Sequence, residues 1–578
     1  MTYTIKNPLI TRSSMNITYL SQQHLLTALE TQPSDSLEFL LLVTGAMDIN
    51  DIQSLEPYLV ESIRILKQGG VLFVQGIPHH LSEIGVFLDK SLIFKYWFAF
   101  ESDVVKTTGL PSVHAGVLLF VKGNGRFNIK RTRLPHQYCR ACGRTLKDWG
   151  GKSHLMHPDG YAVSDVIKDL PPANNYSQIS RPVFDLLLSL LDFNPPQKNN
   201  KPQLIDDLPL QTPSGIVAPT EGLTWRGHIT KETPYQYQLP LFSPASSLEK
   251  SSTITGEKSK ELYDVILHGD ALEILRQYPD ESVDLVFADP PYNLDKAYSA
   301  YSDARKEQLY IQWCDSWLNE YTRILKPTGS LFVLNLPRWA MYHAAFLNKR
   351  LYFQNWIVWD ALSEPRGKIM PAHYALLFYT KQQEGFTFNY DDVKSIDARY
   401  YCLRASCRRG RKKVNDDDKA YVNDIWWDIH RIKHRRDRDR HPCQLPDPLM
   451  ERIIRLATNP GDVVLDAFAG AGTTPVVAYQ LGRRYVAIDL DRNYIEIMQQ
   501  KMAQLSEQGF IFRPSSKQPS WEISKKDLQI ELRNLAAELG YLPTPYDVQK
   551  YSKYTLDVYY KAFPTWGKAL KAAKLEVG

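Results

Sequence analysis

Five consecutive residues, Asp289-Pro290-Pro291-Tyr292-Asn293, place a carboxylate and an aromatic ring around two prolines, directly after the apolar run 283–288. An apolar, β-branched run that two prolines stop predicts a buried strand opening into a rigid loop. Neither proline has an N–H to donate, so the loop offers backbone carbonyls together with its carboxylate. Such a loop could accept hydrogen bonds from an exocyclic amine while the ring stacks on a flat base.

A second stretch, 463–474, runs from an apolar segment into a turn of small residues. A helix is predicted to begin near Thr473. Gly470 and Gly472 would let the backbone come close to a ligand, and free amides at a helix start can meet a carboxylate. Taken alone, such a loop is as consistent with a purely structural turn.

A further apolar run, 484–489, ends in Asp489, about twenty residues beyond the glycine loop. An acid at that position can accept two hydrogen bonds from a ribose diol in nucleotide-binding α/β folds. A helix cap or a turn is the alternative role for Asp489. The glycine loop, this acid and the proline loop together predict a nucleotide-type site on an α/β sheet.

Residues 259–509 resemble the S-adenosylmethionine-dependent DNA amino-methyltransferases, which act on N6 of adenine or N4 of cytosine. The target-amine motif of that family matches Asp289 to Tyr292, its cofactor loop matches Phe468 to Gly472, and its short Gly-Asp element matches Gly269-Asp270. The order of the motifs resembles that of the β group, because the target-amine motif precedes the cofactor loop. The helix before the cofactor strand is expected after His441-Pro442.

The resemblance implies a Rossmann-like α/β fold with a mostly parallel, doubly wound sheet, and S-adenosylmethionine as cofactor. It implies that a flipped base enters the pocket, where Asp289 and the Pro290 carbonyl hold its amine and Tyr292 stacks on it. The catalytic set is then Asp289, Pro290, Pro291 and Tyr292. The cofactor-binding set is Asp270, Asp466, Phe468, Gly470, Gly472, Thr473 and Asp489.

The chemistry leaves three alternatives open. Adenine N6 and cytosine N4 offer the same amine. In the family that the chain resembles, an aspartate at the first loop position is commoner among adenine enzymes, so the resemblance implies a slight preference for adenine. An RNA or protein methyltransferase is a second enzyme class that uses related proline loops. A non-catalytic DNA-binding partner is the third alternative, and it suits the first part of the chain better than the second.

The basic residues are concentrated between positions 399 and 440. This segment has 14 Lys or Arg against seven Asp, whereas the whole chain has a net charge of only +5. Such a local surplus favours contact with phosphates, and a solvated loop is the alternative. The resemblance places the recognition region at about 382–440. The expected DNA contacts are Arg404, Arg408, Arg409, Arg411, Lys412, Lys413, Arg435 and Arg436.

The first part of the chain repeats the second. Residues 62–74 parallel 321–333, and residues 114–122 parallel 373–381, in the same order. Thr44-Gly45-Ala46-Met47 stands where the second copy has its proline loop. We therefore expect a degenerate, inactive copy at 1–195 that packs on the catalytic domain at 259–509 as a built-in pseudo-dimer partner. A homodimer of the chain is the alternative. The first copy should end near Phe193, and residues 196–258 should be a linker.

Cys139-x-x-Cys142 is followed by His154-x-x-His157, which has the ligand types and roughly the spacing of a structural zinc site. The two histidines could equally be polar loop residues. The matching segment of the second copy offers Cys402 and Cys407. If the protein binds zinc, the expected ligands are Cys139, Cys142, His154 and His157.

Residues 522–578 predict three short helices, which suit a small helix-turn-helix module. This segment resembles the repeat appended to homing endonucleases and other DNA-acting proteins, and a dimerisation bundle is the alternative.

Six cysteines in 578 residues are too few for a disulfide scaffold and indicate a reducing cytoplasm. No secretory signal and no membrane span is expected. Double-stranded DNA is the expected partner, with a cognate restriction endonuclease as a further possibility.

Overall fold

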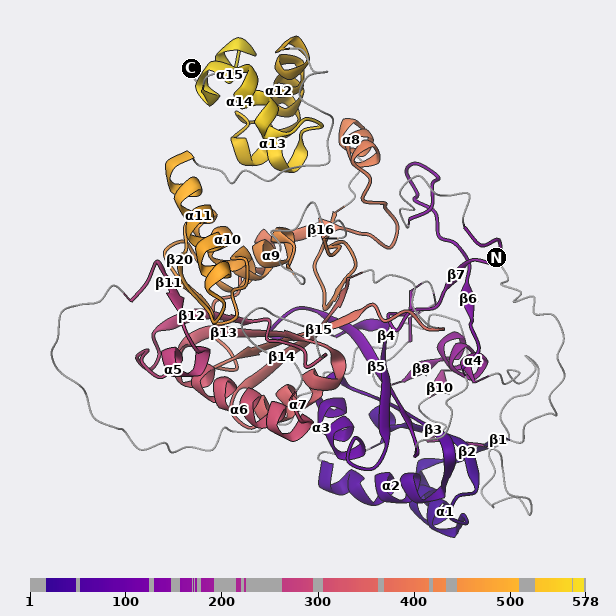
Figure 1. Cartoon of the computed structure of the whole chain (residues 1–578). Helices are drawn as coiled ribbons and strands as arrows, with labels where there is room; N and C mark the ends of the chain where they lie inside the picture. The colour runs from indigo at the N-terminus through magenta and orange to yellow at the C-terminus, as the bar shows by residue number, and fades with distance from the viewer. Residues whose placement is uncertain are drawn as a thin grey trace.

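Among the residues that it describes, the computed structural model contains two large β-sheets with helices packed on them, three two-stranded sheets and a small helical module at the C-terminal end (Figure 1). It describes residues 17–47, 52–105, 107–123, 129–146, 156–168, 170, 172–173, 178–191, 215–219, 223–224, 262–294, 305–361, 368–414, 419–432, 444–508, 525–563 and 565–575. Within these ranges, no helix is long and apolar enough to cross a membrane.

The sheet of the second copy is built from apolar runs that are buried on both faces, as parallel strands require. Its strands among the described residues follow the order β11 (Val265–His268), β20 (Arg484–Asp489), β19 (Val463–Asp466), β12 (Val283–Ala288), β13 (Leu325–Asn335), β15 (His373–Thr380), β14 (Tyr352–Asp360) and β18 (Ile425–Trp426). The first five are mutually parallel, and β15 runs antiparallel to β13 and β14. This order confirms the predicted Rossmann-like fold class.

Helices cover both faces of this sheet. One face carries α5 (Ala271–Leu275), α6 (Glu307–Ile324) and α7 (Pro337–Leu347), and the other carries α9 (Asp447–Ala457), α10 (Thr473–Gln480) and α11 (Arg492–Gln508). In α6 the buried residues Tyr310, Cys314, Trp317 and Tyr321 recur every three or four positions, which places them on one stripe. Because the faces are covered, the carboxyl ends of the strands are where a ligand can enter.

The first sheet repeats the core of the second. Its order is β1 (Ile17–Tyr19), β9 (Gly215–Ala218), β2 (Leu37–Val43), β3 (Leu66–Gly76), β5 (Ser112–Val121) and β4 (Ile93–Val105). The run β2-β3-β5-β4 matches β12-β13-β15-β14, with α2 (Ile52–Ile65) and α3 (Pro78–Leu88) in the places of α6 and α7. Even the ladder irregularity recurs, between Leu37/Phe39 in one copy and Val283/Leu285 in the other. The predicted partial duplication of the fold is confirmed.

The linker prediction for 196–258 needs correction at β9. This strand pairs in parallel with β2, so it occupies the place beside β2 that the cofactor-loop strand β19 has beside β12. Residues 215–218 are buried and apolar, which explains their place in a sheet. The first copy therefore extends beyond Phe193 and keeps a counterpart of β19, followed by Pro219 instead of a glycine loop.

The two copies pack on each other about a pseudo-twofold relation. Helices α3 and α7 contact each other, and the rings of Trp97 and Trp356 stack with centroids 3.9 Å apart. Each indole N–H donates to a histidine of its own copy, Trp97 to His114 (3.2 Å) and Trp356 to His373 (3.1 Å). Since Nε2 of each histidine accepts, Nδ1 carries the proton and donates to the tryptophan carbonyl of the other copy. The two copies thus contact each other through matching residues of each copy.

Two buried carboxyl groups complete this contact. Asp424 accepts from the backbone N–H groups of Val113 (2.8 Å) and His114 (3.1 Å) in the first copy. Asp165 accepts from Ala372 (2.7 Å) and His373 (3.0 Å) in the second. Burial raises the pKa of each carboxyl to about 7, although the donated hydrogen bonds act in the opposite direction. Each copy thus supplies one carboxyl group that accepts backbone N–H groups of the other copy, and these hydrogen bonds fix how the two copies align.

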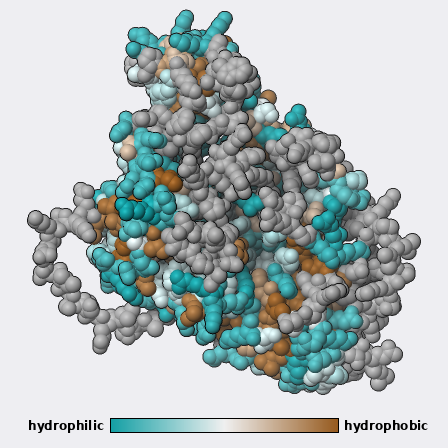
Figure 2. All heavy atoms as spheres, in the orientation of Figure 1, coloured by the Kyte–Doolittle hydropathy of each residue, from teal (hydrophilic) through white to brown (hydrophobic). Residues whose placement is uncertain are grey.

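The C-terminal module has four helices among the described residues, not the three predicted. They are α12 (Lys525–Leu539), α13 (Pro545–Tyr551), α14 (Leu556–Ala562) and α15 (Trp566–Ala572). The module has its own core around Leu528, Leu532, Val548 and Tyr559. Hydrophilic side chains dominate its outer end, at the top of Figure 2. It contacts the catalytic copy through Lys550, whose Nζ lies 3.1 Å from a carboxylate oxygen of Glu451 on α9.

The remaining α-helices and strands among the described residues are short. They are α1 (Leu25–Thr31), α4 (Arg181–Leu190), α8 (Ala405–Lys413), β6 (Arg133–Leu134), β7 (Tyr161–Ala162), β8 (Ile179–Ser180), β10 (Leu223–Thr224), β16 (Lys394–Ile396) and β17 (Lys419–Tyr421).

Candidate active site

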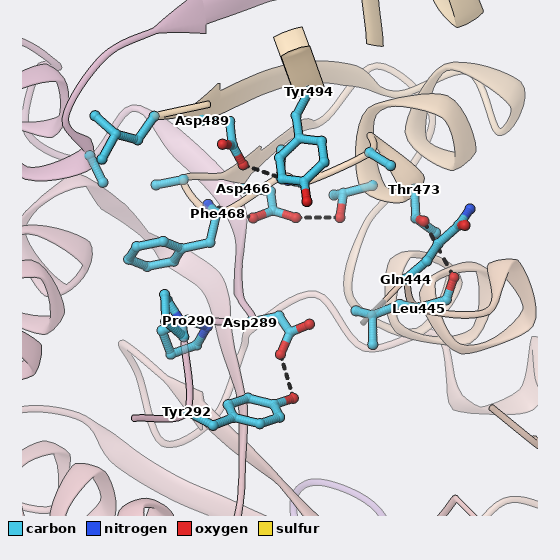
Figure 3. Close-up of a pocket in the computed structure, with 18 of the residues that line it drawn as sticks. Asp289, Pro290, Tyr292, Gln444, Leu445, Asp466, Phe468, Thr473, Asp489 and Tyr494 are labelled. Carbon is cyan, nitrogen blue, oxygen red and sulfur yellow. Dashed lines mark hydrogen bonds between the residues drawn. The ribbon is translucent and has the colours of Figure 1, made fainter. Parts of the chain in front are cut away.

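The candidate active site is a pocket at the carboxyl ends of four adjacent parallel strands, β11, β20, β19 and β12 (Figure 3). The chain proceeds from β12 to β13 on one side and from β19 to β20 on the other, so β12 and β19 flank the switch point of the sheet. Ligands of open α/β sheets bind at such a point. The following predicted residues line the pocket: Asp270, Asp289, Pro290, Pro291, Tyr292, Asp466, Phe468, Gly470, Thr473 and Asp489.

The proline loop follows β12 and is held from both sides. The hydroxyl of Tyr292 donates to Oδ1 of Asp289 at 2.5 Å, which orients the carboxylate (Figure 3). The hydroxyl of Tyr310 on α6 donates to the Pro291 carbonyl at 2.7 Å. Asn293 has a φ of +54° and binds the backbone of Arg305 with both ends of its side-chain amide. Asp289, Pro290 and Tyr292 are thereby fixed at one wall of the pocket.

The glycine loop leaves β19, the strand next to β12, and Asp466 organises it. One carboxylate oxygen of Asp466 accepts from the Phe468 N–H at 2.9 Å, and the other accepts from the Thr474 hydroxyl at 2.5 Å. Burial raises the pKa of Asp466 to about 7. Both of its oxygens hold the loop in shape, and the residue also lines the pocket. The phenyl ring of Phe468 lines the pocket and packs edge-on against Trp317.

Gly472 lies behind the pocket lining. It caps α10 with a φ of +84°, a conformation that costs an L-residue energy. A Cβ atom at this position would lie 2.5 Å from Cγ of Met498. Both the backbone angle and the close approach of α11 therefore require glycine.

Asp489 ends β20 and faces the pocket. Its two carboxylate oxygens each accept one backbone N–H, from Gly470 and from Asp491, both at 2.8 Å. A carboxylate oxygen has two acceptor positions, so each oxygen can still accept a ligand hydroxyl. Burial raises the pKa of Asp489 to about 6. Asp270 caps α5 through the N–H groups of Leu272 and Glu273 and lines the same side of the pocket.

Three aromatic residues of the pocket were missed by the sequence analysis. Tyr310 and Trp313 come from α6, and Tyr494 comes from α11. Tyr310 and Trp313 are three positions apart, so the helical period could have placed them on one face. Tyr494 follows Asp489 by five positions and lies near it in Figure 3.

The basic residues of the predicted recognition region divide between the two sides of α8. Arg408, Arg409, Lys412 and Lys413 are exposed or half-buried. Arg411 was predicted to contact DNA, but it is 2% exposed and its guanidinium binds the Cys402 carbonyl and the Cys407 sulfur. Arg404 donates to the Thr145 carbonyl of the first copy at 2.6 Å. Arg435, Arg436, His441 and Pro442 lie outside the described residues.

The predicted zinc ligands are also rearranged. Cys139 and Cys142 do come together, but their neighbours are Cys402 and Cys407 of the second copy. The imidazole of His157 is 44% exposed and lies 3.6 Å from the Asp159 carboxylate. His154 lies outside the described residues. The cysteine pairs of the two copies thus meet, because the pseudo-twofold packing brings equivalent segments together.

A proline loop and a glycine loop at neighbouring strand ends, with an acid on the next strand, define the class of Rossmann-like transferases with a nucleotide-type cofactor. The family model described as DNA methylase matches residues 283–500, and that of the homing endonuclease associated repeat matches residues 523–576.

Curated relatives extend these matches. Type II methyltransferase M.BamHI of Bacillus amyloliquefaciens is 39% identical over 229 residues, covering 39% of this chain and 54% of that protein. DNA adenine methyltransferase YhdJ of Escherichia coli (strain K12) is 35% identical over 238 residues, covering 40% of this chain and 80% of that protein. A solved DNA modification methylase from Thermus thermophilus, complexed with S-adenosyl-L-methionine, is 24% identical over 41% of this chain and 93% of its own, with a TM-score of 0.30.

The chain therefore belongs to the DNA methylase family of N6- and N4-directed methyltransferases. It spans about half the length of the first relative named above, M.BamHI.

Proposed function

We propose that the protein is a site-specific DNA methyltransferase that transfers a methyl group from S-adenosylmethionine to an exocyclic amine of a flipped base. The observation that carries the proposal is the placement of Asp289-Pro290-Pro291-Tyr292 and of the glycine loop at neighbouring strand ends of one pocket. One loop suits a planar amine and the other suits a nucleotide-type cofactor, so donor and acceptor can meet there.

The target amine is held by the proline loop. The Asp289 carboxylate and the Pro290 carbonyl accept its hydrogens, which leaves the nitrogen lone pair pointing away from both acceptors and toward the methyl donor. The carboxylate also stabilises the positive charge that develops on nitrogen during attack. Tyr292 has a double role, because its hydroxyl holds Asp289 while its ring offers a stacking surface. The base has to leave the duplex to reach this position.

The cofactor side of the pocket fits S-adenosylmethionine. The two oxygens of Asp489 can accept the two ribose hydroxyls, and Phe468 offers an apolar ring in the lining. The start of α10 lies behind Gly470 and favours a carboxylate. When bound, the cofactor supplies an electrophilic methyl group on a sulfonium centre.

Adenine N6 is the proposed target base. The support is the aspartate at the first loop position and the name of one relative, YhdJ, as an adenine methyltransferase. Cytosine N4 is the competing target, because its exocyclic amine offers the same hydrogens and the same lone pair to the proline loop.

Duplex DNA is the proposed substrate, contacted by the outer face of α8 and by the C-terminal module. Arg408 and Lys412 are four positions apart, as are Arg409 and Lys413, so each pair lies along one side of the helix. Lys412 also lies 5.9 Å from the ring centroid of Tyr551 on α13. Helices α8 and α13 are therefore neighbours, so the module lies beside the basic face of α8 and can contact the same stretch of DNA.

The test is the DNA of a methylation-free host that expresses the full chain, sequenced by a method that detects modified bases. The proposal expects one modified base type at one short recurrent sequence. It is refuted if that DNA is unmodified although the soluble protein accumulates, or if only RNA or protein acquires the methyl group. N4-methylcytosine in place of N6-methyladenine would overturn the assignment of the base alone.

A further inference from the structure

Four cysteine sulfurs from the two copies gather around one point. Cys139 and Cys142 come from the first copy, Cys402 and Cys407 from the second, and all four sulfurs lie within 4.8 Å of one another. The Cys139–Cys407 and Cys142–Cys402 sulfur pairs are 3.8 and 3.7 Å apart. Disulfide sulfurs would be about 2.05 Å apart, so these four are free thiols.

The spacing is that of a tetrahedral thiolate site. Four sulfurs that each lie about 2.3 Å from a common Zn²⁺ are about 3.8 Å apart along the edges of the tetrahedron. The Cys139–Cys407 and Cys142–Cys402 separations match this value. Thiols that merely packed as small apolar groups would have no reason to converge on one centre.

The first cysteine pair sits on a tight turn that points both sulfurs to one side. The N–H of Cys139 donates to the Arg144 carbonyl at 2.7 Å, and the N–H of Gly143 donates to the Cys139 carbonyl at 2.9 Å. Gly143 has a φ of +65°, and no atom lies within 4 Å of the position that a Cβ would take there. The backbone turn itself is therefore what requires glycine.

The surroundings suit thiolate ligands. The guanidinium of Arg411 donates to the Cys407 sulfur at 2.9 Å, and the Cys402 N–H donates to the Cys139 sulfur at 3.3 Å. Four thiolates on Zn²⁺ carry a net charge of −2, which a neighbouring arginine and backbone N–H groups stabilise. This explains why Arg411 is buried among cysteines although α8 is otherwise basic and exposed.

The cluster also lies where a crosslink would matter. Arg140 stacks its guanidinium 3.6 Å from the ring centroid of Tyr400, and Arg399 reaches Glu101 at 3.0 Å. These contacts are polar and join the turn of the first copy to the segment that leads into α8. Small loops without a large apolar core are the regions that structural zinc stabilises.

We propose that Cys139, Cys142, Cys402 and Cys407 bind one structural Zn²⁺ that crosslinks the degenerate copy to the recognition segment of the catalytic copy. The metal fixes the start of α8, so the outer arginines and lysines of that helix face outward in one orientation. The degenerate copy thereby contributes two of the four ligands. This site replaces the set with His154 and His157 that the sequence suggested.

The test is the metal content of the purified full chain, measured by mass spectrometry after extensive dialysis. About one zinc per chain is expected. Cys142→Ser and Cys407→Ser should each lose most of it, whereas the control Cys314→Ala, in the core of α6, should retain it. Replacement of zinc by Co²⁺ should give the visible absorption bands of a tetrahedral thiolate site, which tests the ligand set in the unmutated protein.

Three results would overturn the proposal. The first is a full chain that contains no zinc and takes up neither Zn²⁺ nor Co²⁺ after reduction. The second is full zinc content in Cys407→Ser together with its loss in His157→Ala, which would restore the histidine ligand set. The third is a Co²⁺ spectrum without thiolate-to-metal charge transfer.

Discussion

Substitution of Asp424 by asparagine or by alanine should change the stability of the protein by very different amounts. Asp424 is 1% exposed, and one of its oxygens accepts two backbone N–H groups of the first copy. Its other oxygen pairs with the Ser112 hydroxyl at 2.5 Å. Asparagine keeps the first oxygen and can donate to Ser112 from its amide nitrogen, whereas alanine leaves both N–H groups buried without a partner.

The magnitude follows from these contacts. A buried donor left unsatisfied costs about 1–3 kcal/mol, so Asp424→Ala should lower the free energy of unfolding by about 2–6 kcal/mol. Asp424→Asn should lower it by less than about 1 kcal/mol near pH 4, where the buried carboxyl is still protonated and resembles the neutral amide, and the alanine value refers to the same pH. The expected gap between the two variants is large enough for chemical denaturation to resolve.

The pH dependence gives an independent check. Burial raises the pKa of Asp424 from 3.8 to about 7 in the folded state, so the folded state holds the proton more tightly than the unfolded state. The stabilisation by this group is complete below pH 3.8 and is lost as the pH rises to about 7. For each pH unit in that window, the free energy of unfolding of the wild-type protein should fall by up to about 1.4 kcal/mol relative to that of Asp424→Asn.

Equilibrium denaturation of the three proteins, monitored by tryptophan fluorescence, measures both effects. The experiment should cover about pH 4.5 to 8, because the pKa of Asp424 is about 4 in the unfolded state and about 7 in the folded state. Trp97 and Trp356 lie at the contact and report on it directly. Equal destabilisation by alanine and asparagine, or a difference between wild type and Asp424→Asn that does not change with pH, would refute the proposed role of the buried carboxyl.

Three further outcomes are expected. Gly472→Ala should weaken cofactor binding measured by calorimetry, because its Cβ would meet Met498 at 2.5 Å and a φ of +84° strains alanine; unchanged affinity would contradict the packing of α10. Cofactor affinity should fall as the pH drops below about 6, where Asp489 takes up a proton and loses acceptor capacity, and Asp489→Asn should abolish that dependence; a wild-type profile in the variant would contradict the ribose role. Removal of residues 509–578 should weaken duplex binding and flatten its salt dependence while methyl transfer at saturating DNA persists; an unchanged salt slope would exclude the module from phosphate contact.

The sequence predicted those parts of the site whose residues follow one another directly in the chain. Asp289 to Tyr292 and Phe468 to Gly472 each form one short run at a strand end, so the hydrophobic pattern located them. Tyr310 and Tyr494 belong to helices whose faces can be assigned only once the sheet is known. The pocket therefore contains more aromatic groups than the motifs indicated.

The contacts between the copies could not be predicted, because their partners are distant in the chain. The carboxyl group of Asp424 finds its donors about 310 positions away, at Val113 and His114. For the same reason the sequence grouped Cys139 and Cys142 with His154 and His157, whereas the structure places these cysteines beside Cys402 and Cys407. Strand β9 was missed because four residues are too short a run to distinguish from a linker.

The proposed methyl transfer depends on Asp289, which holds the amine that accepts the methyl group. Single-turnover transfer of tritiated methyl from S-adenosylmethionine to duplex DNA, compared between wild type and Asp289→Ala, tests it directly, with the dissociation constants of DNA and cofactor measured in parallel. Loss of the carboxylate should lower the rate about 10³-fold, with both dissociation constants within about threefold of wild type. A variant that methylates DNA at the wild-type rate would contradict this role of Asp289.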